Sequence, residues 1–270
     1  MHPQIAVFPR LGGDNTPPVR TLEGQKTLIS RTMHGFAYDE PRDEIVVMSA
    51  LAQAVLVFRG GASGEEPPIR VIQGPRTQIW GTPYGANSQV SVDPVNNEIY
   101  VPAIPNRILV FDLTANGDVP PKRIITGISG AVAIDPIHNV LIVNGQRGLN
   151  IYDRTVSGEA TPKGVITGPR AAIRRLDTIQ VTTKGWIIAG GGDVTKGTGF
   201  VGAWSINDNG DVAPRWKIAA QKITGYDPYS VAINPAHKEM LIAAAGGNGR
   251  VRPTRGIMNA VVTFSWPEVF

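Results

Sequence analysis

Basic side chains recur in four segments of the chain, and two of these segments, residues 76–89 and 222–230, also contain aromatic rings. The segments are residues 28–35, 76–89, 169–177 and 222–230. Their aromatic rings could stack on sugar rings or bases, with a neighbouring Arg or Lys side chain for an acidic group. Each ring could equally pack between neighbouring sheets of the core. The candidate ligand-binding residues are Arg76, Trp80, Tyr84, Asn87, Arg170, Arg174, Arg175, Tyr226 and Tyr229.

Catalytic chemistry has fewer candidates. His34 could act as a general base or as a ligand, although a single histidine is more often a structural hydrogen-bonding group. In an enzyme it would act with Arg31, Tyr84 and Asp177. The chain has no cysteine, which excludes disulfides, cysteine-ligated zinc and a thiol nucleophile. Zinc-protease, serine-hydrolase, EF-hand and dinucleotide motifs do not occur.

Two glycine-rich segments, residues 190–199 and 246–256, also contain cations. Backbone N–H groups of such loops can cradle phosphate or sulfate. Neither segment fits a P-loop, because the Gly-Lys-Ser/Thr sequence is absent. The alternative is that both are flexible rim loops.

The composition is that of a globular chain, with 42% hydrophobic and 18% charged residues. Gly (31) and Pro (22) are scattered at turns, which favours many short strands over long helices. No apolar stretch reaches the roughly 18–20 residues that span a bilayer. We expect a secreted or periplasmic protein whose signal peptide has been removed, with a cytoplasmic protein as the alternative.

Two patterns repeat along the chain and must position these residues. The first is a β-run, a Gly/Asp/Asn turn, a proline and another β-run; its copies begin at Ile5, Val55, Ile108, Leu149 and Val201. The second is an apolar strand, a tight turn, often Asp-Pro, and a second apolar strand; its copies begin at Gly35, Gln89, Ala131, Thr178 and Ser230.

Together the two patterns make a unit of four antiparallel strands, here A to D, which is a propeller blade. Five copies predict an all-β, five-blade propeller with little or no helix, as a single domain over residues 1–270. The alternative is six blades, one of them abbreviated or split. Histidines 138 and 237 then lie in solvent-exposed A–B turns.

Strand C occurs at both ends of the chain, as Ile5–Phe8 and Ala260–Trp266. We expect Pro18–Leu22 to complete the last blade as its strand D. One strand C is then spare. It could be a fifth strand, part of an abbreviated blade, or an edge that pairs with another copy of the chain to form an oligomer.

The stretches "VDPVNNEIYV…NRILVF" and "MHGFAYDEPRDEIVV…AVLVF" resemble NHL-repeat β-propellers, which are broadly similar to lactonase and gluconolactonase-type propellers. The resemblance covers nearly the whole chain. Gluconolactonase-like propellers hold a divalent metal in the central channel. The resemblance offers only Asn87, Asp177 and Asn144 as counterparts, and no early strand A begins with the family's Glu. No metal is therefore assigned, with calcium as the cofactor alternative.

In such a propeller the D–A and B–C loops share one face, and the A–B and C–D turns share the other. Sorting charges in this way places most of the 22 acidic residues, Glu65, Asp118 and Asp211 among them, on the turn face. It places half of the 26 basic residues on the loop face. A basic face attracts anions. The alternative is a solvated surface without a role.

These patterns favour a non-catalytic, exported binding or scaffold propeller. Its basic, aromatic loop face would bind an anionic or glycan ligand or an acidic partner protein, with no specific nucleic acid and no membrane span. One alternative is an enzyme with its site at the channel mouth, either a metal-dependent lactonase or hydrolase, or a polysaccharide lyase. The other is assembly through the spare strand.

Overall fold

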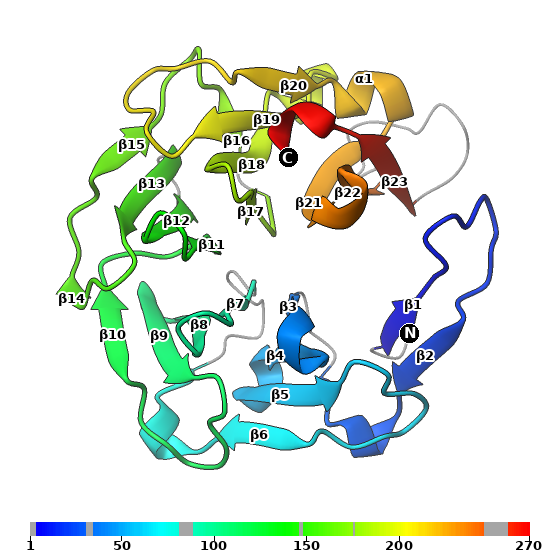
Figure 1. Ribbon diagram of the computed structural model, residues 1–270, viewed down its shortest axis with the longest axis vertical. Coiled ribbons are helices and arrows are strands. Elements are labelled where there is room, and N and C mark those ends of the chain that lie inside the picture. The colour runs from blue at the N-terminus through cyan, green and yellow to red at the C-terminus, as the bar shows by residue number, and fades with distance from the viewer. Residues whose placement is uncertain (1–3, 31–34, 81–88, 146–147, 175, 246–258) are drawn as a thin grey trace. The chain divides into compact units, whose positions relative to one another are not determined.

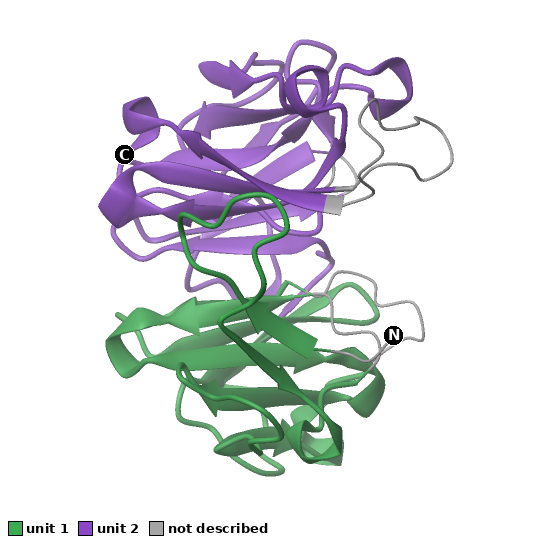
Figure 2. Cartoon of the chain, turned by 90° about the vertical axis from the view of Figure 1, so that its right-hand side faces the viewer, with its two compact units in different colours: residues 1–124 green, residues 125–270 purple. Residues whose placement is uncertain are grey.

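The computed structural model describes residues 4–30, 35–80, 89–145, 148–174, 176–245 and 259–270. The fold class is the predicted one, an all-β chain with the sheets of a five-blade β-propeller (Figure 1). The chain divides into two compact units, residues 1–124 and 125–270, which Figure 2 colours separately. Each unit is described by itself, and the single domain over residues 1–270 stays a prediction.

The first unit contains three sheets in its described part. A two-stranded sheet pairs β1 (Gln4–Val7) with β2 (Arg20–Glu23). The next sheet has the order β3 (Phe36–Asp39), β4 (Glu44–Ser49), β5 (Ala54–Arg59) and β6 (Arg70–Gln73). The third contains β7 (Ser91–Asp93), β8 (Glu98–Ala103), β9 (Arg107–Asp112) and β10 (Arg123–Thr126), and the boundary between the units falls within β10.

The second unit adds β14 (Gly158–Glu159), which pairs in parallel with β10 at Ile125 and Thr126. Its first sheet has the order β11 (Ala131–Asp135), β12 (Val140–Gly145), β13 (Gly148–Asp153) and β15 (Gly164–Ile166). Its second contains β16 (Ile173–Arg174), β17 (Gln180–Val181), β18 (Trp186–Gly191), β19 (Phe200–Ser205) and β20 (Trp216–Ile218). Its third contains β21 (Asp227–Asn234), β22 (Glu239–Ala245) and β23 (Asn259–Ser265).

The second strand of each blade forms much of the core. Every residue of β4 and of β8 is buried, so both faces of these strands are covered. Such strands read as continuous apolar runs rather than as alternating ones. The predicted Asp turns are also present: the Asp93 carboxylate accepts the backbone N–H of Asn96 at 3.0 Å. The local sequence therefore encodes both the buried strand and the turn that precedes it.

The C–D segments follow a longer path than the predicted simple turn. Each brings a glycine in the left-handed region beside strand D of the preceding repeat, in a parallel bridge. The pairs are Leu22 with Gly64, Ile72 with Gly117, Ile125 with Gly158 and Ile166 with Gly210. Successive repeats are thus joined by backbone hydrogen bonds as well as by side-chain packing.

Three local elements add detail to the sequence prediction. The strand expected to complete the last blade forms as β2 and pairs with β1 in a two-stranded sheet. A short helix, α1 (Ala220–Thr224), forms in a segment read as a loop, which agrees with the prediction of little helix. The segment before Asp177 forms β16, which pairs with the end of β18.

Candidate functional site

The loops that were predicted to share a face do meet within each unit. In the first unit, the D–A segment contributes Trp80 and the B–C segment leads into Arg107, whose guanidinium lies 4.4 Å from the centre of the Trp80 ring. In the second unit, Gln221 of α1 donates from Nε2 to the carbonyl of Val194 in the B–C segment at 2.9 Å. Each pair joins a D–A segment to a B–C segment.

Trp80 and Arg107 form a stacked pair at the surface of the first unit, which we call the Trp80–Arg107 platform. Trp80 is 49% exposed. Arg107 Nη1 donates to Gln78 Oε1 at 3.2 Å, and Nη2 donates to the Ile104 carbonyl at 2.9 Å. These neutral acceptors fix the guanidinium over the ring without cancelling its charge. Among the described residues no ion pair joins Arg107 to a carboxylate.

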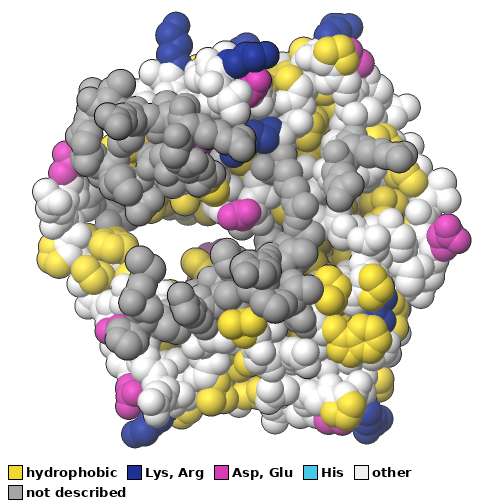
Figure 3. Space-filling view, turned by 180° about the vertical axis from the view of Figure 1, so that it is seen from behind, with side chains coloured by type: hydrophobic (Ala, Val, Ile, Leu, Met, Phe, Trp, Pro, Cys, Tyr) yellow, Lys and Arg dark blue, Asp and Glu magenta, His cyan; other side chains and the backbone are white. Residues whose placement is uncertain are grey.

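One face of the molecule carries side chains of mixed character (Figure 3). Figure 3 shows hydrophobic side chains on this face beside separate Lys and Arg side chains. Arg76, also predicted to bind a ligand, is exposed and lies four residues before Trp80 in the sequence. An exposed indole with a fixed cation suits a ligand that has both a flat apolar face and an acidic group.

Arg174 and Tyr229 form a second, less exposed pair, in the second unit. The Arg174 guanidinium lies 5.9 Å from the centre of the Tyr229 ring, and its Nη1 donates to the Pro228 carbonyl at 2.9 Å. Asp227 is 6% exposed, and its carboxylate accepts a hydrogen bond from Gln221 Nε2. Burial raises the pKa of Asp227, and the positive charge of Arg174 opposes this effect.

The remaining predicted residues of the second unit separate into exposed and buried ones. Arg170 and Asp177 are exposed, and the Asp177 backbone N–H donates to the Tyr229 carbonyl at 2.9 Å. Tyr226 is only 5% exposed and packs in a core cluster with Ala220, so it is a core residue and not a surface stacking group. Asn144 is fully buried and donates to the Arg174 carbonyl at 3.3 Å.

Other predicted residues lie outside the described residues. They are Arg31, His34, Tyr84, Asn87 and Arg175. In the part of the chain that the structure describes, no three His, Asp or Glu side chains form a group that could hold a metal ion. None of the described helices is long and apolar enough to cross a membrane.

Most backbone N–H groups of the glycine-rich segment 190–199 donate to acceptors within the chain. The backbone N–H of Thr195 donates to Asp193 Oδ1 at 2.9 Å, and that of Gly199 donates to Gln221 Oε1 at 2.8 Å. The N–H groups of residues 196–198 donate to carbonyls within the same segment. The alternative of a rim loop is therefore favoured over a phosphate cradle for this segment, because most of its donors already have acceptors within the chain.

Three acidic residues that were predicted to lie on the turn face lie instead at the other end of the blade, beside the D–A loops. Glu65, Asp118 and Asp211 accept the backbone N–H groups of Gln25, Arg76 and Arg170 at 3.1, 2.8 and 2.7 Å. Each acceptor is carried there by its C–D segment, which runs along strand D of the preceding repeat. Negative charge therefore lies at the start of the D–A loops, and the loop face is less basic than its sequence suggests.

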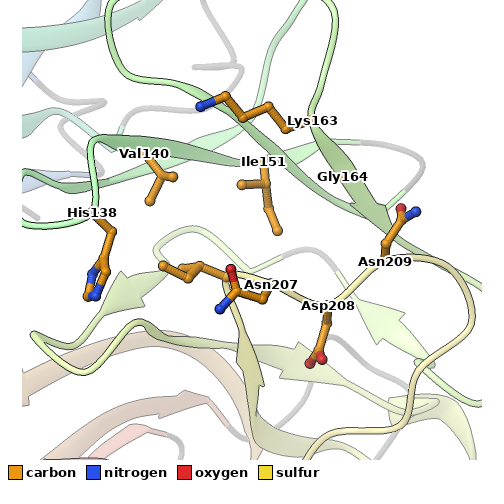
Figure 4. A pocket seen from close by; sticks show the side chains of 9 residues that line it. His138, Val140, Ile151, Lys163, Gly164, Asn207, Asp208 and Asn209 are labelled. Atoms are coloured by element: carbon orange, nitrogen blue, oxygen red, sulfur yellow. The ribbon is translucent and has the colours of Figure 1, made fainter.

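Sequence reasoning missed a groove in the second unit. It has a volume of about 440 Å³, with an apolar floor of Val140, Ile151 and Ile206. Polar residues form its rim, His138 and Lys163 among them. Figure 4 shows the side chains of Val140 and Ile151 pointing toward the segment that carries Asn207 and Asp208. A position-by-position comparison of the repeats would have revealed it, as shown below.

Comparison with known proteins leaves the fold as the main guide to function. Neither a protein-family model nor a curated protein matches the chain.

Proposed function

We propose that the chain is a non-catalytic binding propeller of the NHL-like class, which takes an acidic glycan on the Trp80–Arg107 platform. The observation that carries the proposal is the Arg107 guanidinium, which lies 4.4 Å from the centre of a half-exposed indole and, among the described residues, donates to carbonyl oxygens and to no carboxylate. An acidic sugar has both features that this surface can recognise, a ring face for Trp80 and a carboxylate for Arg107.

The Trp80–Arg107 platform is already in place before a ligand binds. Arg107 has three hydrogen bonds to Gln78 and Ile104, so little side-chain freedom is lost when a ligand arrives. Exposed Arg76 adds a second cation on the same D–A segment. Export to a secreted or periplasmic location, where extracellular polysaccharides occur, belongs to the same proposal.

The test is a calorimetric titration with oligogalacturonate. Trp80→Ala and Arg107→Gln should each weaken binding roughly tenfold, because each removes one of the two recognition elements, worth about 1–2 kcal/mol. Arg59→Gln is the matched control, since Arg59 is an exposed arginine of the same unit already paired with Glu66 at 2.8 Å. Equal losses in all three variants, or none, would overturn the proposal.

The same titration separates binding from catalysis. A lyase would form a double bond in the sugar, which appears as ultraviolet absorbance, and a hydrolase would shorten the oligomer. Unchanged oligomer after long incubation, with and without calcium, agrees with a binding protein. Turnover that depends on calcium would replace the proposal with the enzyme alternative.

A further inference from the structure

The groove of the second unit occupies a position that other repeats fill with an ion pair. In the sheet of β3–β6, Glu44 begins the second strand and Arg70 begins the fourth. Arg70 Nη1 donates to Glu44 Oε1 at 2.8 Å, and its Nη2 donates to the Leu113 carbonyl of the next repeat at 3.2 Å. Both side chains of this pair are largely buried: Arg70 is 18% exposed and Glu44 is 11% exposed.

The next sheet repeats the arrangement. Glu98 begins β8 and Arg123 begins β10, and Arg123 Nη2 donates to Glu98 Oε2 at 2.8 Å. These side chains are 6% and 15% exposed. Two repeats thus place a carboxylate and a guanidinium at the same two strand starts.

In the sheet of β11–β15 both charged residues are missing. Val140 begins β12 and Gly164 begins β15. The register confirms that the positions correspond, because Arg70 pairs with Val57 and Gly164 pairs with Ile151. The residue before each of them also donates its backbone N–H to the carbonyl of that same partner: Ile69 to Val57, and Lys163 to Ile151, both at 2.7 Å. Val140, Ile151 and Gly164 all line the groove. The groove is therefore the space that a Glu–Arg pair fills elsewhere.

The following sheet fills this position with aromatic rings. Trp186 begins β18 and Trp216 begins β20, and Trp216 pairs with Ala203 in the same register. The two indole rings meet edge to face with their centres 4.6 Å apart. The fold therefore accepts either a buried ion pair or an indole pair at this position.

We propose that the groove binds a small, neutral aromatic ligand of about the size of indole. The floor of Val140, Ile151 and Ile206 has no carboxylate at the position of Glu44 and Glu98, so a guanidinium seated there would lack the partner that it has in the first two repeats. The carboxylate that does line the groove, Asp208, belongs to the rim. The volume of about 440 Å³ is within the range of small-molecule pockets. An aromatic ring is the occupant that the fold itself places at this position one repeat later.

The rim provides hydrogen-bonding groups without a large net charge. The His138 ring is held through Nδ1, 2.6 Å from Oδ2 of the buried Asp135, so Nε2 is the ring atom that Asp135 does not hold. Lys163 Nζ lies 2.9 Å from Asp153 Oδ2, which balances its charge. Asp208 Oδ2 accepts the Ser205 backbone N–H at 2.8 Å. A ring N–H or hydroxyl could hydrogen-bond with this rim.

The test titrates indole, with agmatine as a guanidinium-bearing comparison, into isotope-labelled protein and follows the backbone amide resonances by NMR. Indole should bind the wild-type chain with a Kd of roughly 0.1–1 mM, as expected for a ligand of this size. Backbone amide resonances of Gly164 and Asn207 should shift during the titration. No binding of indole, or tighter binding of agmatine, would overturn the proposal.

Variants copied from the other repeats locate the site. Val140→Glu with Gly164→Arg rebuilds the ion pair and should close the groove and abolish indole binding. Val140→Glu alone adds the carboxylate and should switch the preference from indole to agmatine. Thermal unfolding checks that both variants are folded. Indole binding that is unchanged in the folded double variant would show that the ligand binds elsewhere. This site is independent of the Trp80–Arg107 platform, so Trp80→Ala should leave indole binding intact.

Discussion

The Glu98 carboxylate, at the start of β8, accepts hydrogen bonds from two neighbouring side chains, Arg123 and Tyr100. Burial by itself raises the pKa of this carboxyl, but hydrogen bonds from Arg123 and Tyr100 dominate and lower the pKa to about 2. The ordinary value is 4.5. An acid whose pKa is depressed in the fold stabilises it above the ordinary pKa. This contribution is lost as the pH falls from about 4.5 to about 2.

Glu98→Gln should therefore lower the free energy of unfolding by about 3 kcal/mol at pH 7, because a buried guanidinium loses its counter-charge. The difference from wild type should shrink toward pH 2. Urea unfolding at several pH values measures both effects. The control is Glu66→Gln, which removes the carboxylate from an exposed pair with Arg59 and should leave stability unchanged. A loss that is independent of pH would contradict this account.

The pKa of the Asp227 carboxyl is shifted in the opposite direction from that of Glu98. Burial raises its pKa, with Arg174 opposing, so the folded chain holds this proton more tightly than the unfolded chain does. The fold therefore loses stability as the pH rises through this pKa, and the charged carboxylate is a cost at neutral pH.

Asp227→Asn should raise the Tm by about 2 °C at pH 7, because the amide removes the charge and can still accept the hydrogen bond from Gln221. The gain should shrink as the pH falls toward and below the ordinary carboxyl pKa of 3.8. Differential scanning calorimetry measures both. A lower Tm at pH 7 would show that attraction to Arg174 outweighs the cost of burial.

At the residue scale, the sequence indicates which side chains could bind a ligand, but it does not indicate which of them are exposed. Trp80 and Tyr226 both stand in basic, aromatic D–A segments. Trp80 is 49% exposed, whereas Tyr226 is 5% exposed and packs against α1 and neighbouring strands. The positions of the two residues in the sequence do not distinguish them, because the exposure of a side chain depends on neighbours from distant parts of the chain.

At the scale of elements, the C–D segments join one repeat to the next. Asp118 reaches back to cap the backbone N–H of Arg76, and the carboxylate then lies against Gly74. Gly74 has φ +132°, and a Cβ there would lie 2.4 Å from the Asp118 carboxylate carbon. Gly117, in the same C–D segment, has φ +78° and open space around it.

Gly74→Ala should thus cost more than Gly117→Ala. The second variant bears only the backbone strain of a left-handed residue, about 1 kcal/mol. The first adds displacement of Asp118 and loss of its cap, for a total of roughly 2–3 kcal/mol. Chemical denaturation of both variants provides the comparison. Equal losses would show that the Asp118 contact contributes nothing.

The sequence predicts elements well where the signal is local. Asp-Pro turns and apolar runs identified the four-stranded repeats and their number. The pairing of the C–D segments with the preceding repeat was not predicted, because the partners are distant in the sequence: Gly117 pairs with Ile72 and Asp118 caps Arg76. The groove did have a sequence signal, the change from Glu and Arg to Val140 and Gly164, which requires comparing the repeats with one another.

At the scale of the whole molecule, the net charge of +4 is a weak guide to binding. Glu65, Asp118 and Asp211 bring negative charge to the D–A loops, so a broad positive field is not the basis of the proposed function. Recognition should depend on the single Trp80–Arg107 platform and be only moderately sensitive to salt. Assembly through a spare edge strand stays a prediction, and light scattering would reveal it as a mass above 28.9 kDa.

The most direct test of the binding function compares oligogalacturonate with its methyl ester, which has the same sugar rings without the charge. We predict that wild-type protein binds the acid about tenfold more tightly than the ester, and that Arg107→Gln binds both equally. Isothermal titration calorimetry at constant salt measures the four affinities. Equal binding of acid and ester by the wild-type protein, or a preference that persists in Arg107→Gln, would contradict the proposed role of the platform.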